Sequence, residues 1–237
     1  MVVATAACGN RYFSSDAPDA ALPDDGGADA SGSDAAPPDD GGSGDAPPLD
    51  AASDADADAD RVFTGCNGVL ACTRTAFVTS MLFSGKLGGL EGADAKCQAL
   101  ADGSSLTAVR GKRFLAWLAD GTTGPTDRFP HGTGTYQRTD GAQLANGWSD
   151  LVDATLNLPL DRDENGIQLL PNVSTYVWTG VDAAGTASPV LHCLKWTTAN
   201  GGSEVGTIGK HIASDQTWTF YVSTTCDASA ALYCFEY

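Results

Sequence analysis

The chain has 237 residues, a formal net charge of −17 and 42% hydrophobic residues, which is enough apolar material for one or two ordinary domains. No apolar run reaches about 18 residues, so the sequence predicts no membrane-spanning helix. The acidic balance and the lack of a basic stripe argue against a nucleic-acid partner, because binding to phosphates requires clustered cations.

The first segment, residues 1–13, places a cysteine in a lipoprotein-like context. Ala6 and Ala7 precede Cys8, and Gly9 follows it. This pattern resembles the end of a bacterial lipoprotein signal, whose cysteine receives a diacylglycerol, although the basic start and the apolar stretch are short. Either the true start of the protein lies upstream, or Cys8 is incidental. We favour lipidation of Cys8, because a multiply acylated cysteine followed by a charged tether would hold the protein at a membrane.

Residues 14–60 form a segment with fourteen Asp and no Lys, Arg or Glu, in which nearly all other residues are Ala, Pro, Gly or Ser. Such a chain has almost nothing to bury and its like charges repel, so the composition predicts a disordered linker. As a spacer it would span roughly 40 Å as a coil and at most about 150 Å when taut. A solubilising tail would have the same composition, and we favour the spacer because of the candidate lipid-attachment site before it.

Residues 61–237 are predicted to form one folded domain, with twelve basic and sixteen acidic residues. Segments rich in β-branched and aromatic residues predict strands at 77–80, 114–118, 176–178, 191–196, 218–222 and 232–235. The Gly- and Asp-rich region 120–171 has weak periodicity and is expected to form long loops. The result is an α+β fold, mainly antiparallel sheet with one or two helices and long loops.

One helix is predicted over residues 90–101. Leu90, Ala93 and Cys97 recur there at helical spacing, and Gly103 would end the helix.

Apart from Cys8, the chain has six cysteines, at positions 66, 72, 97, 193, 226 and 234. An even number without a CxxC pair or a metal-type Cys/His spacing favours three disulfides over a zinc site. Cys66 and Cys72 are near in sequence and are expected to close a local loop, whereas spacing alone leaves the other pairings open. Six buried free thiols in a cytosolic protein are the alternative. Three disulfides predict an extracytoplasmic location.

Several blocks of sequence together resemble endostatin, the carboxy-terminal fragment of certain collagens, and a related bacterial family of unknown function in the C-type lectin-like superfamily. The resemblance covers residues 75–237, and its blocks are 84–98, 114–118, 177–180, 193–196, Cys226 and 232–236. It implies nested disulfides, Cys97 with Cys234 around Cys193 with Cys226, which leaves Cys66 with Cys72. It also implies that Trp117, Trp178 and Trp196 are core residues, with Trp148 and Trp218 less certain.

A calcium site is the first candidate for chemistry. Asp161, Asp163 and Asn165 match the first half of an EF-hand loop, in which alternating oxygens wrap a hard cation. The twelfth position is Asn172, where a bidentate Glu should stand, so a polar turn is the favoured interpretation. Calcium is the only cofactor that the sequence suggests. The calcium-binding and zinc-binding motifs of C-type lectins and endostatin do not occur.

Arg110, Lys112 and Arg113 form a basic cluster that could contact a sulfated or phosphorylated glycan, as the arginines of endostatin contact heparin. A solvated turn is the favoured alternative. His131 and His192 are separated from each other and from His211 and match no catalytic motif, so no enzymatic activity is expected.

The sequence as a whole predicts a non-catalytic surface or secreted lipoprotein, held by its lipid in a bacterial outer membrane or at the cell surface. Its domain would bind a glycan, matrix component or protein through the loops of 120–171, because binding residues are often carried on loops. A structural envelope protein without a dedicated ligand is the alternative, and an uncharacterised hydrolase is a third.

Overall fold

The computed structural model describes residues 64–170, 176–182 and 184–237, which all fall within one compact unit, Ser53–Tyr237. The predicted lipidation site Cys8, the predicted linker 14–60 and Asn172 lie outside the described residues. No helix in the described part of the chain is long and apolar enough to cross a membrane.

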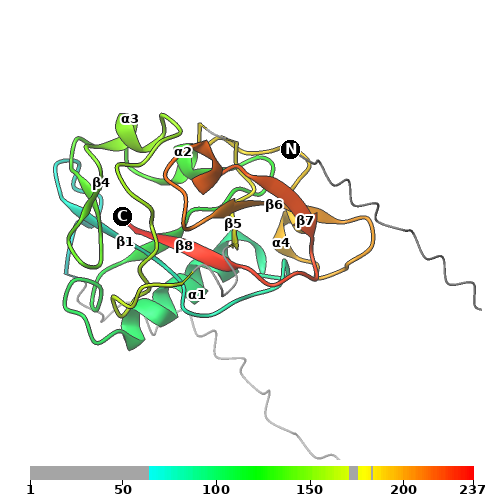
Figure 1. Ribbon diagram of the computed structural model, residues 1–237, viewed down its shortest axis with the longest axis horizontal. Helices are drawn as coiled ribbons and strands as arrows, with labels where there is room; N and C mark the ends of the chain where they lie inside the picture. Colours follow the sequence, from blue (N-terminus) through cyan, green and yellow to red (C-terminus); the bar gives the residue numbers. More distant parts are fainter. Residues whose placement is uncertain (1–63, 171–175, 183) are drawn as a thin grey trace, which may run out of the picture. The chain divides into compact units, whose positions relative to one another are not determined.

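The described residues form a mixed eight-stranded sheet with one long helix and three single-turn helices, so the α+β prediction with mainly sheet is confirmed (Figure 1). The strand order is β4-β3-β1-β8-β5-β6-β7, with β2 paired to β8 beside this path. In chain order the elements are β1 (Arg74–Val78), α1 (Gly89–Gly103), β2 (Phe114–Ala116), α2 (Pro125–Arg128), β3 (Tyr136–Arg138), β4 (Gln143–Ala145), α3 (Trp148–Leu151), β5 (Tyr176–Trp178), α4 (Cys193–Trp196), β6 (Val205–Lys210), the 3₁₀ turn η2 (Gln216–Trp218), β7 (Val222–Thr225) and β8 (Ala231–Glu236).

Strand β8 lies in the middle of the sheet, and all six of its residues are buried. It pairs antiparallel with β1 and β2 and parallel with β5. The β1–β3 pairing is also parallel, and the remaining pairings are antiparallel. A strand that is buried on both faces has to be apolar almost throughout, which explains its sequence Ala-Leu-Tyr-Cys-Phe-Glu.

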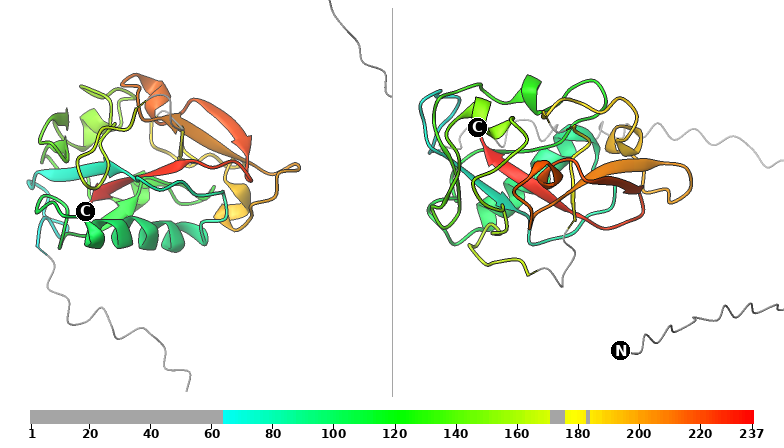
Figure 2. Two further views of the ribbon diagram at one scale, coloured as in Figure 1. Left: turned by 60° about the horizontal axis from the view of Figure 1, so that its bottom comes forward. Right: turned by 45° about the horizontal axis from the view of Figure 1, so that its top comes forward.

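Helix α1 covers one face of the sheet beside β2 and β8 (Figure 2). Leu90, Ala93, Cys97 and Ala101 are its buried residues, and they recur at helical spacing. The observed span therefore confirms the prediction of a helix over 90–101.

Two predicted strands are wrong, and four strands were not predicted. Residues 191–196 contain a tight turn, and 218–222 contain the end of η2 and a short loop before β7. Each segment contains a tryptophan that packs in the core, and Trp196 and Trp218 are at most 1% exposed. Their apolar character therefore reflects burial and not strand formation. Strands β3, β4, β6 and β7 were missed, since the predicted segment 218–222 shares only Val222 with β7. In β6, Gly206 and Gly209 weaken the strand pattern.

The core has two hydrophobic clusters. Phe77, Leu87 and Trp178 belong to the one that includes the buried face of α1. Trp117 and Trp218 belong to the other, where their ring centroids are 5.3 Å apart. All five tryptophans are buried, including the two for which the sequence was less decisive.

Three disulfides close the fold, and they pair as the resemblance implies. The Cα atoms are 5.6 Å apart in Cys97–Cys234, 5.7 Å in Cys193–Cys226 and 5.5 Å in Cys66–Cys72. Three such bonds indicate an oxidising, extracytoplasmic environment.

The short element α4 is a left-handed turn made without glycine. Cys193, Leu194, Lys195 and Trp196 have φ values of 49°, 51°, 57° and 62°. His192 caps the turn, since its Nδ1 accepts a hydrogen bond of 2.9 Å from the backbone N–H of Lys195. Its Nε2 lies 3.2 Å from the carbonyl oxygen of residue 189, so both ring nitrogens of His192 contact the backbone at this turn. A left-handed conformation costs an L-residue roughly 1–2 kcal/mol, and the disulfide and the buried indole of Trp196 offset this cost.

Replacing Leu194 with glycine should therefore stabilise the protein. Leu194 is 53% exposed, so little burial is lost, and glycine adopts its φ without a steric penalty. After the extra chain entropy of glycine, the expected gain in the free energy of unfolding is about 0.5–1 kcal/mol, measured by denaturant titration.

Val190→Gly is the matched control. Val190 is 72% exposed and does not have a positive φ, so glycine should destabilise the protein there. Equal destabilisation by both substitutions would contradict the assignment of strain to the turn.

Candidate functional site

The three candidate calcium ligands are held by separate internal partners. Oδ1 of Asp161 forms an ion pair of 2.6 Å with Arg138, and Asp163 accepts a hydrogen bond of 2.9 Å from the backbone N–H of Asn165. The side-chain oxygen of Asn165 accepts from the backbone N–H of Ser105 at 3.2 Å. Within the described ranges, Asp161 and Asp163 do not belong to a group of acidic, histidine or thiol side chains compact enough to hold a metal ion. This arrangement supports the polar-turn interpretation over a cation site.

Arg138 is the centre of an ion-pair network that fixes this turn against β3. Its guanidinium contacts Asp161 and, at 2.6 Å, Oδ2 of Asp140, which also lies 3.1 Å from Nε of Arg162. Burial alone would raise the pKa of Asp140, but hydrogen bonds from Arg138, Ala142 and Arg162 together lower it to about 2. The carboxylate is therefore stabilised in its charged form by the folded structure.

The predicted basic cluster does not form one basic surface. Lys112 points into the protein and forms an ion pair of 2.9 Å with Glu236, whose side chain is 1% exposed. Arg110 donates from Nε to the carbonyl oxygen of Ser104 at 2.8 Å, whereas Arg113 lines a cavity beside the last residue. The three candidate ligand-binding side chains therefore do not converge, because Lys112 compensates a buried carboxylate, and this supports the solvated turn that the sequence favoured.

Glu236 is a buried acid that the sequence analysis did not identify. Its oxygens accept hydrogen bonds of 2.9 Å from the backbone N–H groups of Cys66 and Thr75, in addition to the ion pair with Lys112. Among the described residues, one group of acidic and thiol side chains is compact enough to hold a metal ion, and it consists of Cys66, Cys72 and Glu236. The two sulfurs are bonded to each other and the carboxylate is already satisfied, so this group ties the Cys66–Cys72 loop to β8.

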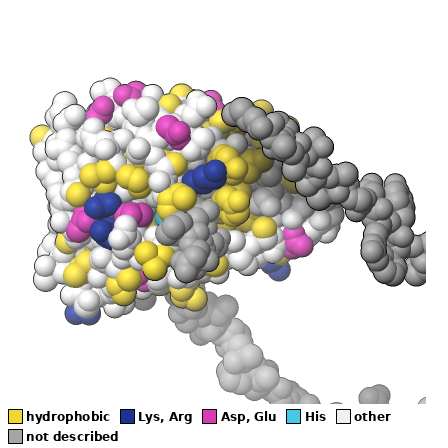
Figure 3. All heavy atoms as spheres, in the orientation of Figure 1, with side chains coloured by type: hydrophobic (Ala, Val, Ile, Leu, Met, Phe, Trp, Pro, Cys, Tyr) yellow, Lys and Arg dark blue, Asp and Glu magenta, His cyan; other side chains and the backbone are white. Residues whose placement is uncertain are grey.

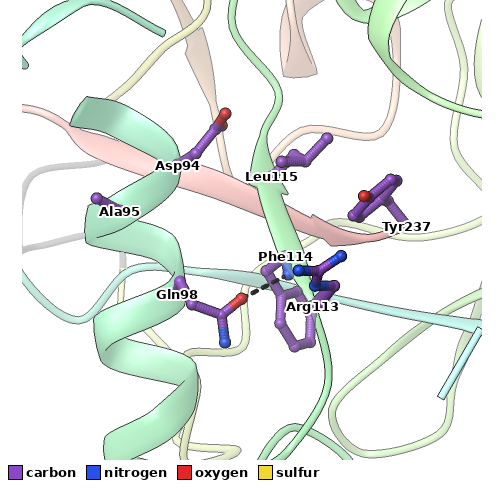
Figure 4. A pocket seen from close by; sticks show the side chains of 7 residues that line it. All are labelled: Asp94, Ala95, Gln98, Arg113, Phe114, Leu115 and Tyr237. Atoms are coloured by element: carbon purple, nitrogen blue, oxygen red, sulfur yellow. Dashed lines mark hydrogen bonds between the residues drawn. The ribbon is translucent and has the colours of Figure 1, made fainter. Parts of the chain in front are cut away.

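A cavity of about 260 Å³ lies between α1 and the β2 edge (Figure 4). In Figure 4, Asp94 and Gln98 project from α1, and Leu115 and Tyr237 lie across from them. Burial raises the pKa of Asp94, although its ion pair with Arg128 acts in the opposite direction. The backbone N–H of Ala116 donates to Asp94 at 2.8 Å, and that of Phe114 donates to Gln98 at 3.0 Å. These side chains already serve the fold, which makes the cavity a weak candidate for catalysis or ligand binding.

The strongest candidate lies at the β5–β6–β7 end of the sheet, where Tyr176, Lys210, Phe220, Tyr221 and Val222 form what we call the aromatic surface. The four apolar side chains are 40%, 41%, 41% and 47% exposed. The rings of Tyr176 and Tyr221 are nearly parallel, at 13°, with centroids 6.2 Å apart. Nζ of Lys210 lies 3.4 Å from the ring centroid of Tyr221. Figure 3 shows hydrophobic side chains gathered around a basic one in the region where Figure 1 places β6 and β7.

Strand pairing places these residues together. Tyr176 is opposite Lys210 in the β5–β6 register, and the backbone N–H of Tyr221 donates to the carbonyl oxygen of Ile208 at 2.9 Å. The next residue along the chain, Val222, begins the β6–β7 ladder opposite Ile208. The aromatic surface thus draws on β5 and on the β6–β7 hairpin, which are separated in sequence, and no local motif identifies it.

A scan against models of known protein families and a search of curated proteins found no match to this chain.

The ion-pair network around Asp140 predicts a specific loss of stability in acid. Because the pKa of Asp140 is lowered to about 2, its stabilisation is complete above its ordinary pKa and is lost as the pH falls from about 5 to 2. Asp140→Asn should lower the free energy of unfolding by about 1 kcal/mol at pH 6, after allowance for solvent screening.

Denaturant titrations of both proteins between pH 6 and pH 2 test this expectation. The difference between wild type and Asp140→Asn should shrink steeply as the pH falls to 2, where about half of the wild-type carboxylate is protonated. A difference that stays constant over this range would exclude the charge of Asp140 as its cause.

Proposed function

We propose that the chain is a non-catalytic extracytoplasmic binding protein whose aromatic surface contacts a glycan. The observation that carries this proposal is the pair of exposed, nearly parallel rings of Tyr176 and Tyr221, with Lys210 against one of them. Sugar rings have apolar C–H faces that pack on aromatic rings, and hydroxyls that need polar partners close by. Tyrosine offers both, and it loses little conformational entropy on binding because it has few rotatable bonds.

The rigid scaffold under the aromatic surface supports this function. The Cys193–Cys226 disulfide lies close to the strands that carry it, since the backbone N–H of Cys226 donates to the carbonyl oxygen of Glu204 just before β6. A surface that is already ordered in the free protein loses less freedom when it binds a ligand.

We also propose that the fold is C-type lectin-like and related to endostatin. Three features support this: the first described strand pairs with the last, a long helix follows the first strand, and the two long-range disulfides are nested. The proposed ligand surface lies outside the 120–171 loops that the sequence favoured, since its side chains come from residues 176 to 222.

The proposed location is the bacterial outer membrane or cell surface, where an acylated Cys8 and the spacer 14–60 would hold the domain away from the lipid. A secreted protein is the alternative. The disulfides support both, because both lie outside the reducing cytosol.

Tyr221→Ala should remove binding to glycans. The folded, oxidised protein is applied to an array of glycans and proteins, and the dissociation constant of the strongest glycan is then measured by calorimetry. We expect the variant to bind at least about tenfold more weakly, because truncation removes the ring that contacts both Tyr176 and Lys210.

The control is Ile167→Ala. Ile167 is 62% exposed and is not part of the aromatic surface, so its variant should bind like wild type. Binding of proteins but no glycan, or unchanged affinity in Tyr221→Ala, would refute the proposal.

Lipidation makes a separate prediction. Mass spectrometry of the protein from its native host should find a diacylglyceryl group on Cys8, and Cys8→Ser should move the protein from the membrane fraction to the soluble fraction. An unmodified Cys8 in membrane-associated protein would exclude this anchor.

A further inference from the structure

We infer that two copies of this chain pair along strand β7, so that their sheets join into one continuous sheet across a two-fold axis. The observation that carries this inference is the difference between the edges of the sheet. The fold covers the edges at β2 and β4 with its own hydrogen bonds. In the described part of the chain, no strand lies on the outer side of β7.

Strands β2 and β4 show how this fold closes an edge. On the outer side of β2, the backbone N–H groups of Phe114 and Ala116 donate to side chains of α1, at 3.0 Å and 2.8 Å. On the outer side of β4, the backbone N–H of Asn157 donates to the carbonyl oxygen of Leu144 at 2.9 Å. Groups of this kind, when they are left unpaired, form a template for a strand of another chain.

Strand β7 lacks the features that usually keep an edge strand from pairing. Together with β6, it lies at the end of the sheet away from β4 (Figure 1). Proteins commonly protect such a strand with charged residues or proline, and the sequence Val-Ser-Thr-Thr of β7 contains neither. Val222 is 47% exposed, and Ser223 is exposed as well. β-Branched residues of this kind favour the extended conformation that pairing requires.

The hydrogen bonds of the β6–β7 hairpin show which groups of β7 point away from β6. The backbone N–H of Cys226 donates to the carbonyl oxygen of Glu204, and opposite pairs in an antiparallel ladder alternate between bonded and non-bonded. Ser223 is three positions along, so its pair with Thr207 is non-bonded. In agreement with this, the backbone N–H of Thr207 donates in the other direction, to residue 191. The N–H and C=O of Ser223 therefore face outward.

These outward groups of Ser223 are complementary to a second copy of themselves. A residue that lies opposite its own copy in an antiparallel pair exchanges two hydrogen bonds with it, one in each direction. The two-fold axis then passes between the two Ser223 residues, and Val222 lies beside Thr224 of the second copy. Because β7 carries no charge, no like charges meet across this axis. The same uncharged strand thus supplies both halves of a symmetric interface, which favours a second copy over an unrelated strand.

Pairing along β7 has a consequence for the aromatic surface, and this step rests on the proposed function. The two-fold axis of an antiparallel strand pair is perpendicular to the sheet, so both copies present the same face. Tyr221 directly precedes β7, which places the two aromatic surfaces on either side of the axis. A glycan with repeated units would contact both surfaces, and its second contact would be intramolecular.

The test measures the oligomeric state of the full, oxidised chain by sedimentation equilibrium. All samples carry Cys8→Ser, so that no intermolecular disulfide of Cys8 joins two chains. The solution contains about 150 mM NaCl, which screens the repulsion between the acidic segments. A single strand pair is a small interface, so we expect a reversible monomer–dimer equilibrium with a dissociation constant on the order of 10–100 µM.

Ser223→Pro is the diagnostic variant. Proline removes an N–H that does not bond to β6, so the hairpin keeps its own hydrogen bonds, and edge strands tolerate proline. The dissociation constant of the dimer should rise at least about tenfold. Ser223→Ala is the matched control, because it changes the same side chain and keeps the N–H. Its dissociation constant should stay within about threefold of that of wild type.

Two further measurements keep the test decisive if the proline variant folds poorly. Ser223→Lys keeps the N–H but places two ammonium groups across the axis, where the Cα atoms of a bonded pair are about 5.5 Å apart. Dimerisation should weaken at least about tenfold, and part of the loss should disappear in high salt. In wild type, hydrogen exchange of the Ser223 amide should slow down as the protein concentration rises, because pairing protects this N–H.

The outcomes decide the inference without reference to glycan binding. A chain that is still monomeric at about 500 µM, well above the expected dissociation constant, would overturn it, even if β7 bound a strand of another protein. A dimer that Ser223→Pro and Ser223→Lys leave unchanged would also overturn it, because such a dimer uses another surface. Glycan binding is tested separately with Tyr221→Ala, so the failure of one proposal is distinguishable from the failure of the other.

Discussion

The buried strand β8 is the constraint on which the rest of the structure depends, and the bond between Cys97 and Cys234 holds it in place. This disulfide joins α1 to the centre of the sheet across a sequence separation of 137 residues. In the chain-entropy model a loop of that length contributes about 5 kcal/mol, by restricting the unfolded chain. Because β8 pairs with β1, β2 and β5, the correct position of these strands depends on its alignment.

The carboxyl-terminal end of β8 is also held by polar contacts of Glu236. Burial of this carboxylate requires a cation, which is then no longer available at the surface. Glu236 is fully buried, and a buried carboxylate is tolerated only when it is paired and hydrogen-bonded. Lys112 and the backbone of the Cys66–Cys72 loop meet this requirement. The same compensation recurs around Arg138. The fold thus uses many of its cations for internal purposes, and this is why a basic cluster in the sequence did not become a basic surface in the structure.

The sequence predicted those features that depend on a pattern within one short segment, and it missed those that depend on contacts between distant segments. Helix α1 and strand β8 have strong local patterns, and both were found; the two long-range disulfides followed from a resemblance and not from spacing. Residues 191–196 misled the prediction because a hydrophobic, tryptophan-containing segment normally forms a strand, whereas here a disulfide and a histidine cap hold it in a left-handed turn. The aromatic surface could not be predicted, because Tyr176, Lys210 and Tyr221 meet only through strand register.

The left-handed turn at 193–196 and the aromatic surface are connected through strand β6. The Cys193–Cys226 disulfide anchors the turn next to the start of β6, where the backbone N–H of Thr207 donates to the carbonyl oxygen of residue 191 at 2.9 Å. At the far end, the same β6–β7 hairpin carries Lys210 and Tyr221. An edge hairpin of this size is marginally stable alone, so its order has to come from such anchors. The fold therefore offsets the conformational cost of the left-handed turn, and the exposed rings are held in position, as the proposed binding function requires.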